Sequence, residues 1–216
     1  MNNNGLISFL QERLKLTLPG IKAHKQMAPL AMGKLFRSFK PNNNSKRSSV
    51  LVLITQTEND DEYAIFFTLR SSKLNSHSGQ ISFPGGSAEH GETPEETALR
   101  ETYEETGIAS EKITTLGRLS DLYVPPSNST ISPVIGYCPK LPLLNLNPDE
   151  VEESFLVPIS NLINPETFKN EEWTIEGKNV TIPFWSVHPT TPLLGASAMI
   201  LMELLEIINE FDKIQA

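Results

Sequence analysis

Cysteine, histidine and long hydrophobic runs are scarce in this sequence. Cys138 is the only cysteine, so no internal disulfide can form, and this usage fits a reducing compartment. The four histidines and one cysteine are not spaced as zinc ligands. The most apolar stretch, 192–208, is interrupted by Glu203 and Glu206 and is too short to cross a bilayer. Residues 1–4 do not begin a signal peptide, so we expect a cytoplasmic protein without a membrane partner.

Positive charge is also in short supply. The chain has 18 Lys and Arg against 26 Asp and Glu, which gives a net charge of -8. Because phosphate backbones attract basic side chains, this balance argues against a nucleic-acid partner. A small phosphorylated substrate remains compatible, since a bound dication reverses the local sign of charge. The hydrophobic share of 38% over 216 residues is that of an ordinary globular chain.

The hydrophobic pattern divides the chain into an N-terminal arm and a main domain. Apolar residues near the start recur at helical spacing: Leu6, Ile7, Leu10 and Leu14. Residues 41–49 are polar and rich in Asn, which is typical of a linker or an exposed loop. We therefore expect a helical arm and linker over residues 1–48, packed on the domain, and one domain over residues 49–216.

Strand and helix signals interleave within the main domain. Apolar and β-branched runs predict strands or hairpins at 50–55, 63–70, 113–123, 131–138 and 173–187. Residues 151–163 combine strand and short-helix signals, and 193–211 predict a long helix with Glu203, Glu206 and Glu210 on an exposed stripe. This order lacks a strict strand–helix–strand rhythm. It favours an α/β (α+β) fold with a mixed sheet and helices on both faces.

An unusually acidic helix is predicted between Thr93 and Gly107. Thr93 can cap the first turn, and Glu96, three residues later, completes a capping box. Pro94 suits the first helical position, and Gly107 suits the position just past the end. We therefore expect a helix over 94–106.

Three carboxylates share one side of this predicted helix. Glu101, Glu104 and Glu105 stand at i, i+3 and i+4. Two unit charges 5 Å apart repel by about 3 kcal/mol at an effective dielectric of about 20. Water and salt would relieve the repulsion on an open surface, where Arg100 could pair with Glu96 or Glu104. A hard dication such as Mg²⁺ would instead coordinate these oxygens. On the helix alone, a solvated acidic face is the favoured interpretation over a metal site.

The spacing of the whole segment resembles the Nudix box. The fixed positions of that motif are present as Gly86, Glu92, Arg100-Glu101, Glu104-Glu105 and Gly107-Ile108. Thr102 stands where an aliphatic residue is usual, and we expect it to face the core. The resemblance implies a Nudix-like α/β/α sandwich that hydrolyses nucleoside diphosphate derivatives with Mg²⁺ or Mn²⁺.

The resemblance also implies roles for particular side chains. It makes Glu101, Glu104 and Glu105 metal-binding and catalytic, with Glu101 one candidate for the general base. It makes Arg100 the arginine that fixes a box glutamate, and Glu92 an acid that supports the loop or an outer metal. Gly86 and Gly107 are implied to be structural.

The segment upstream of this motif narrows the resemblance to the coenzyme A pyrophosphatase branch of the family. Residues 66–86 match the signature of that branch at Thr68, Arg70, Ser71, Gly79, Phe83, Pro84, Gly85 and Gly86. Phe66 and Phe67 replace leucines, and Asn75 stands where a second arginine is usual. The implied substrate-binding residues are Arg70, Ser71, His77, Gly79, Gln80, Gly85 and Gly86. A surface ion pair for Arg70, an exposed loop position for His77 and a loop-capping role for Gln80 are the competing structural roles.

The resemblance weakens downstream but still suggests a metal-binding acid. Glu150, in the stretch 149–160, is the candidate for a further ligand, with a turn at the sheet edge as its competing role. Together these features predict a coenzyme A or acyl-coenzyme A diphosphatase that releases adenosine 3′,5′-bisphosphate and 4′-phosphopantetheine. The alternatives are hydrolysis of ADP-ribose, NADH or a nucleoside triphosphate, or a Nudix module that binds a nucleotide without cleaving it. The expected partner is a small nucleotide, and a homodimer is left open.

Overall fold

The computed structural model describes residues 5–36, 40, 44–57, 62–73 and 79–215. The helices are α1 (Leu6–Arg13), α2 (Ile21–His24), α3 (Pro94–Thr106), α4 (Ile159–Ile163) and α5 (Gly195–Gln215), with short 3₁₀ turns η1 (Lys25–Met27), η2 (Ser110–Lys112) and η3 (Pro125–Ser127). The strands are β1 (Leu30–Ala31), β2 (Lys34–Leu35), β3 (Lys46–Gln56), β4 (Tyr63–Arg70), β5 (Ile81–Ser82), β6 (Gly85–Ser87), β7 (Thr114–Arg118), β8 (Leu122–Val124), β9 (Ser129–Cys138), β10 (Val151–Pro158), β11 (Phe168–Ile175) and β12 (Lys178–Trp185).

A mixed sheet forms the centre of the molecule. Its main order is β10-β4-β3-β9-β7, with β5 paired to β4, β6 to β3 and β8 to β9. Strands β3 and β9 run parallel, and the other pairs in this sheet are antiparallel. The predicted hairpin of β3 and β4 is present, with Ile54 opposite Ile65. The expected mixed sheet is therefore confirmed.

The first residues of β3 correct the prediction of a linker at 41–49. Lys46, Arg47, Ser48 and Ser49 are part of the strand and pair with the start of β9. Their polar side chains find partners across the ladder, because the Ser48 and Ser129 hydroxyls lie 2.7 Å apart and Ser49 Oγ donates to the Ser132 carbonyl at 2.6 Å. The polar residues at these positions therefore belong to the end of a strand, where their hydroxyl groups form hydrogen bonds with the neighbouring strand.

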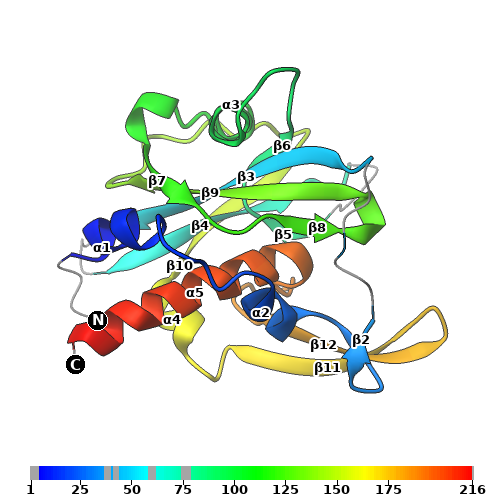
Figure 1. Ribbon diagram of the computed structural model, residues 1–216. Coiled ribbons are helices and arrows are strands. Elements are labelled where there is room, and N and C mark those ends of the chain that lie inside the picture. Colours follow the sequence, from blue (N-terminus) through cyan, green and yellow to red (C-terminus); the bar gives the residue numbers. More distant parts are fainter. Residues whose placement is uncertain (1–4, 37–39, 41–43, 58–61, 74–78, 216) are drawn as a thin grey trace.

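Helices cover both faces of the sheet, with α3 on one side and α5 on the other (Figure 1). The core beneath α3 is small and contains Leu51, Leu53, Phe66, Ala98, Ile108, Ile113, Val134 and Cys138. The core on the α5 side is larger and includes alternate β3 and β4 residues such as Val52, Ile54, Ile65 and Phe67. Successive strand residues point to opposite faces, so β3 and β4 supply both cores.

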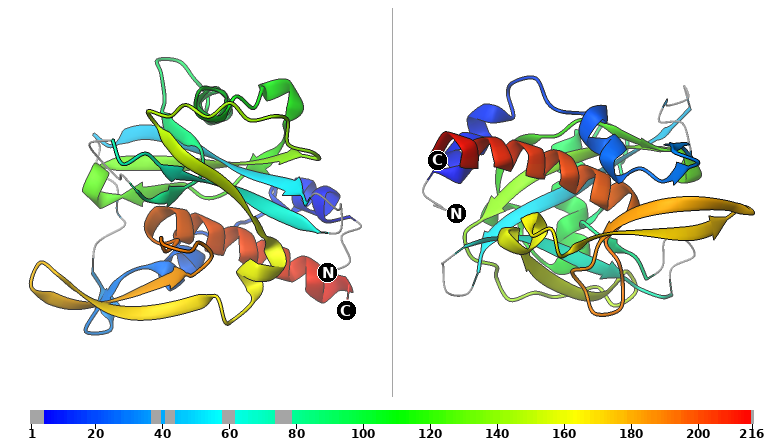
Figure 2. Two further views of the ribbon diagram at one scale, coloured as in Figure 1. Left: turned by 180° about the vertical axis from the view of Figure 1, so that it is seen from behind. Right: turned by 90° about the horizontal axis from the view of Figure 1, so that it is seen from below.

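The N-terminal arm packs against the last helix, as α1 and the end of α5 lie side by side in all the views (Figure 2). Leu6 and Leu10 are buried, and the rings of Phe9 and Phe211 are 5.2 Å apart. Packing of the arm on the domain therefore agrees with the prediction. Glu203 departs from it: its side chain is fully buried.

A second, four-stranded sheet has the order β11-β12-β1-β2. The predicted hairpin around Gly177 supplies β11 and β12, and the short β1 and β2 extend it from the N-terminal arm. Two-residue strands have no periodic signal, so the sequence did not reveal β1 and β2. Among the described residues, none of the helices is both long and apolar enough to span a membrane.

Candidate active site

Helix α3 begins and ends where its sequence predicts. Thr93 Oγ1 accepts a hydrogen bond from the Glu96 backbone amide at 3.3 Å, and Glu96 Oε2 accepts from the Thr93 amide at 2.8 Å, which completes the capping box. At the other end Gly107 has φ 75°, a left-handed conformation that favours glycine, and its amide donates to the Tyr103 carbonyl at 2.8 Å. These ends fix which way each glutamate of the helix points.

The glycines before the helix allow the chain to pass very close to it. Strand β6 pairs with β3 so that Gly86 lies opposite Ser49 and Gly85 opposite Val50. A Cβ on Gly86 would stand 2.3 Å from Glu101 Oε2, and a Cβ on Gly85 would stand 2.3 Å from the Ser49 carbonyl oxygen. Gly86 thus makes room for a carboxylate, and Gly85 makes room for the neighbouring strand.

The three glutamates of α3 lie at three depths. The side chain of Glu105 is 2% exposed, that of Glu101 14% and that of Glu104 51%. Thr102 is fully buried, as expected, whereas its neighbour Tyr103 is 59% exposed. The acidic side of the helix therefore runs from solvent into the space between α3 and the sheet.

Arg100 connects the carboxylates of the box. Its Nε and Nη2 donate to the two carboxylate oxygens of Glu92 at 2.7 and 3.0 Å. Its Nη1 donates to Glu101 at 3.0 Å and to Glu104 at 3.2 Å. Hydrogen bonds from Arg100 and from the Glu89 amide lower the pKa of Glu92 to about 2. The expected salt bridge between Arg100 and box glutamates is therefore present, and both oxygens of Glu92 are engaged by the arginine.

Glu105 is the least satisfied charge of the site. Burial raises its pKa to about 8, with nearby Glu150 and Glu101 adding to the rise and Arg70 opposing it. Arg70 Nη1 lies 3.7 Å from Glu105 Oε1, which is a loose ion pair. Glu105 Oε2 and Arg70 Nε are buried, and neither has a hydrogen-bond partner among the described residues. A buried acceptor left in this way indicates a position that a ligand completes.

Glu150 approaches the same space from the loop before β10. Its charge contributes to the raised pKa of both Glu101 and Glu105, which places its carboxylate near theirs. For Glu101, burial is the largest cause of the raised pKa. The Glu150 carbonyl accepts from the Ser71 amide at 2.8 Å, so the loop is tied to the end of β4. The structure thus brings together Glu101, Glu105, Glu150 and Arg70 from three separate segments.

The donor chemistry of this site fits a hard dication. Carboxylate oxygens are the ligands that Mg²⁺ and Mn²⁺ prefer, and the buried Glu105 Oε2 has no hydrogen-bond partner among the described residues. Within the described ranges no three acidic, His or Cys side chains are already arranged as a metal cage. Arg100 explains part of this, because it holds the oxygens of Glu92, Glu101 and Glu104.

Three of the other predicted substrate residues, Ser71, Gly79 and Gln80, lie between the end of β4 and the start of β5. Ser71 is buried, Gly79 has φ 66° and its amide donates to the Arg70 carbonyl at 3.0 Å. Gln80 accepts from the Arg70 amide through its backbone carbonyl at 3.0 Å. His77 and Asn75 lie outside the described residues.

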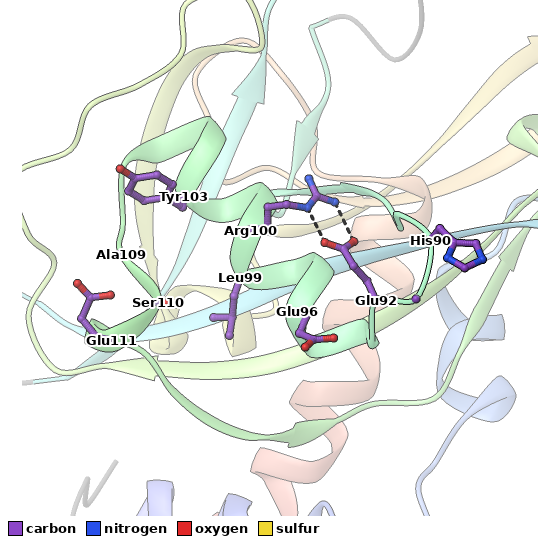
Figure 3. Close-up of a pocket in the computed structure, with 10 residues that line it drawn as sticks. His90, Glu92, Glu96, Leu99, Arg100, Tyr103, Ala109, Ser110 and Glu111 are labelled. Carbon is purple, nitrogen blue, oxygen red and sulfur yellow. Dashed lines mark hydrogen bonds and ion pairs between the residues drawn. The ribbon is translucent and has the colours of Figure 1, made fainter.

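A separate hollow of about 840 Å³ lies on the outer side of α3. His90, Leu99, Tyr103 and Glu111 line it, together with the ion-paired Arg100 and Glu92 (Figure 3). Glu101, Glu105 and Glu150 do not line this hollow. The hollow is therefore separate from the buried carboxylates of Glu101 and Glu105.

Comparison with known proteins agrees with this arrangement. The model of the NUDIX domain family matches residues 45–176. The chain is 31% identical over 182 residues to Nudix hydrolase 3 of Caenorhabditis elegans, covering 77% of this chain and 76% of that protein. The chain therefore belongs to the NUDIX domain family and is a Nudix hydrolase. Enzymes of this family use divalent metal ions and cleave nucleoside diphosphate derivatives.

Two further relatives carry more specific names. A peroxisomal coenzyme A diphosphatase of Mus musculus is 30% identical over 129 residues, covering 59% of this chain and 54% of that protein. A mitochondrial coenzyme A diphosphatase of Homo sapiens is 37% identical over 107 residues, covering 48% of this chain and 45% of that protein. The matched segments span about half the length of these two relatives.

A solved structure shares the fold. The crystal structure of a Nudix hydrolase from M. smegmatis aligns with a TM-score of 0.50 at 17% identity, covering 80% of this chain and 96% of that chain. The predicted sandwich of a mixed sheet between helices is confirmed by this likeness and by the layers of Figure 1.

Proposed function

We propose that the protein hydrolyses the diphosphate bridge of coenzyme A or an acyl-coenzyme A. One water adds across the P–O–P linkage, so one phosphorus gains the water oxygen and the other keeps the bridging oxygen. The products are adenosine 3′,5′-bisphosphate and 4′-phosphopantetheine, acylated where the substrate was. The observation that carries the proposal is the convergence of the coenzyme A-type segment, ending in Gly85 and Gly86, on Glu101 and Glu105.

In this proposal Glu101, Glu104, Glu105 and Glu150 hold Mg²⁺ or Mn²⁺. The bound dication would supply positive charge to the diphosphate and make the attacking water more acidic. Arg70, whose Nε has no partner among the described residues, would turn its guanidinium toward a phosphate oxygen and form a charge-assisted hydrogen bond. Arg100 would keep Glu101 and Glu104 oriented through the bonds it makes to both.

The two relatives named as coenzyme A diphosphatases support the choice of substrate. The match of Thr68, Arg70, Ser71 and Gly79 to the signature of that branch supports it as well. Asn75, which replaces the usual arginine, is the position where affinity for a phosphate of coenzyme A would be reduced.

Product analysis tests the proposal directly. Purified protein would be incubated with Mn²⁺ or Mg²⁺ and, separately, with coenzyme A, acyl-coenzyme A, ADP-ribose, NADH and nucleoside triphosphates. We expect adenosine 3′,5′-bisphosphate and 4′-phosphopantetheine from coenzyme A, and these products to form far more slowly with Glu105→Gln. Preferred cleavage of another nucleotide would reject the substrate. Tight nucleotide binding with no turnover on any of them would favour a binding module.

A further inference from the structure

The loop that leads to Glu150 is docked on the end of α3 through backbone hydrogen bonds. The Asn145 amide donates to the Thr106 carbonyl and the Asn147 amide to the Glu105 carbonyl, both at 2.9 Å. Carbonyls in the last turn of a helix have no partner within the helix. The loop donates hydrogen bonds to two of these carbonyls, and one of them belongs to Glu105, so the loop is held directly against the backbone of Glu105.

The side chain of Asn147 then reaches from this anchor to Glu150. Its Nδ2 donates to Glu150 Oε1 at 3.0 Å, while its Oδ1 accepts from the Asp149 amide at 3.2 Å. Its carbonyl accepts from the Glu150 amide at 3.1 Å and from the Val151 amide at 2.8 Å. One residue therefore contacts the main chain of one predicted metal ligand and the carboxylate of another.

Glu150 needs such a hold because it faces like charges. Its carboxylate lies close enough to Glu101 and Glu105 to raise the pKa of each. Repulsion favours rotation of a half-buried Glu150 side chain away from the other two acids and toward water. The donor to Oε1 opposes that rotation, and among the described residues none donates a hydrogen bond to Oε2.

We propose that Asn147 is a positioning residue that aligns Glu150 with Glu101 and Glu105. The inference rests on the proposed function, in which these acids hold a dication. Asn147 does not touch the metal or the diphosphate. It acts through Glu150, and its backbone bond to the Glu105 carbonyl sets the distance between the loop and α3. Substitution of a residue that hydrogen-bonds to a metal ligand typically lowers metal affinity by about 10- to 100-fold.

The competing role is purely local. Asn147-Pro148-Asp149 is a turn sequence, and an Asn side chain that bonds the amide two residues on is a common turn device. Asn147→Ser separates the roles, because a Ser hydroxyl can still accept from the Asp149 amide but is too short to reach Glu150. The backbone bonds of residue 147 survive the substitution.

Asn145→Ser is the matched control. Asn145 lies in the same loop, its amide also bonds a carbonyl at the end of α3, and the residue is exposed. The readout is the dissociation constant for Mn²⁺, obtained from the electron paramagnetic resonance signal of free Mn²⁺ without substrate. We expect Asn147→Ser to weaken Mn²⁺ binding about 10-fold. Asn145→Ser should stay within about 2-fold of wild type, because among the described residues the Asn145 side chain forms no hydrogen bond with Glu101, Glu105 or Glu150.

A double-mutant cycle with Glu150→Gln shows whether Asn147 acts through Glu150. Once the carboxylate is removed, we expect Asn147→Ser to change Mn²⁺ binding by less than about 2-fold. An undiminished effect in that background would overturn the proposal. So would unchanged Mn²⁺ binding in Asn147→Ser, or in Glu150→Gln alone. Asn147→Thr serves as the second variant if Asn147→Ser does not fold.

The readout also separates this inference from the choice of substrate. Mn²⁺ binding is measured on the free protein, so failure to cleave coenzyme A leaves the cycle interpretable. Conversely, if the protein cleaves coenzyme A but the Asn147→Ser variant binds Mn²⁺ normally, the proposed function stands and the positioning role of Asn147 is rejected.

Discussion

Two buried glutamates on opposite sides of the sheet have opposite surroundings. The side chain of Glu105 on α3 is 2% exposed, one of its oxygens has no hydrogen-bond partner among the described residues, and its pKa is raised to about 8. Glu203 on α5 is 0% exposed and accepts four hydrogen bonds: from the Gly20 amide at 2.8 Å, His24 Nε2 at 2.9 Å, the Ser120 amide at 3.2 Å and the Ser120 hydroxyl at 2.7 Å. Burial alone would raise the pKa of Glu203, but the donors outweigh it and lower that pKa.

Burial of an acid therefore does not reveal its role, whereas the count of its donors does. Glu203 joins the N-terminal arm, the β7–β8 connection and α5, and its charge is compensated within the fold. Glu105 faces two other acids, one loosely paired arginine and a single backbone donor, the Gly85 amide. The first arrangement stabilises the native state, and the second stores a repulsion that a dication can relieve.

Glu105→Gln should give the largest functional effect. Loss of a metal ligand is expected to reduce kcat by roughly 10³-fold, equivalent to about 4 kcal/mol of transition-state stabilisation. The melting temperature without added metal should stay the same or rise, because an uncompensated buried charge is removed. Steady-state kinetics and thermal unfolding check both parts. A variant that keeps most of the wild-type rate would contradict the metal assignment.

Glu203→Ala should show the reverse pattern. Removing one partner of a buried, hydrogen-bonded pair costs about 3–5 kcal/mol of unfolding free energy, since the donors of Gly20, His24 and Ser120 are left unpaired. Activity measured well below the melting temperature should change little. Denaturant unfolding gives the stability, and Glu206→Ala on the same helix, at a less buried position, should cost less than about 1 kcal/mol. Equal losses in the two variants would refute the special role of Glu203.

Substitutions of the adjacent glycines Gly85 and Gly86 should likewise separate an effect on stability from an effect on activity. Gly86→Ala places its Cβ against the mobile end of Glu101, so we expect about 10- to 100-fold lower kcat with little change in stability. Gly85→Ala places its Cβ against the Ser49 backbone. Because the backbone of a paired strand cannot move as a side chain can, we expect a loss of about 1–3 kcal/mol in the free energy of unfolding. Steady-state kinetics and denaturant unfolding of both variants show whether Gly86 mainly affects activity and Gly85 mainly affects stability. Identical behaviour would show that Gly86 has no particular relation to Glu101.

The pH dependence of stability should also differ between the two glutamates. The pKa of Glu105 is raised from 4.5 to about 8, so its folded form binds the proton more tightly and stability falls as pH rises between these values. The advantage of Glu105→Gln over wild type should therefore grow from pH 5 to pH 8, by at most about 1.4 kcal/mol per pH unit.

The pKa of Glu203 is lowered, so its contribution is present above the ordinary pKa and is lost only as pH falls through the lowered value. The cost of Glu203→Ala should then be constant over the same pH range. Urea unfolding in a metal chelator provides both profiles, and a flat difference for Glu105→Gln would disprove the raised pKa.

Local signals in the sequence were sufficient for α3 and for part of the sheet. Thr93, Pro94 and Gly107 act through backbone groups within one helical turn, so they predict the ends of the helix without knowledge of the rest of the chain. The same holds for β4, whose apolar run coincides with the strand. The site residues on α3 follow from these ends, although their different depths do not, because depth depends on where the sheet lies.

Features that depend on distant partners were not visible in the sequence. Glu203 has the spacing of an exposed acid on an amphipathic helix, and only the docking of Gly20, His24 and Ser120 makes it a buried one. Asn147 gave a turn signal, in the sequence Asn-Pro-Asp, but its bond to Glu150 requires the loop to be placed on α3. Pairing of the arm with β12 likewise joins segments about 150 residues apart, which no local pattern encodes.

The hydrogen bonds from Gly20 and His24 to Glu203 span 183 and 179 residues. During synthesis the arm emerges from the ribosome long before α5 does, at about 5–20 residues per second. The leucines of the arm therefore remain uncovered for roughly ten seconds or more before α5 is synthesised and can pack against them. Chaperone engagement with the nascent chain should accordingly concentrate on this early segment and end when the final helix is released.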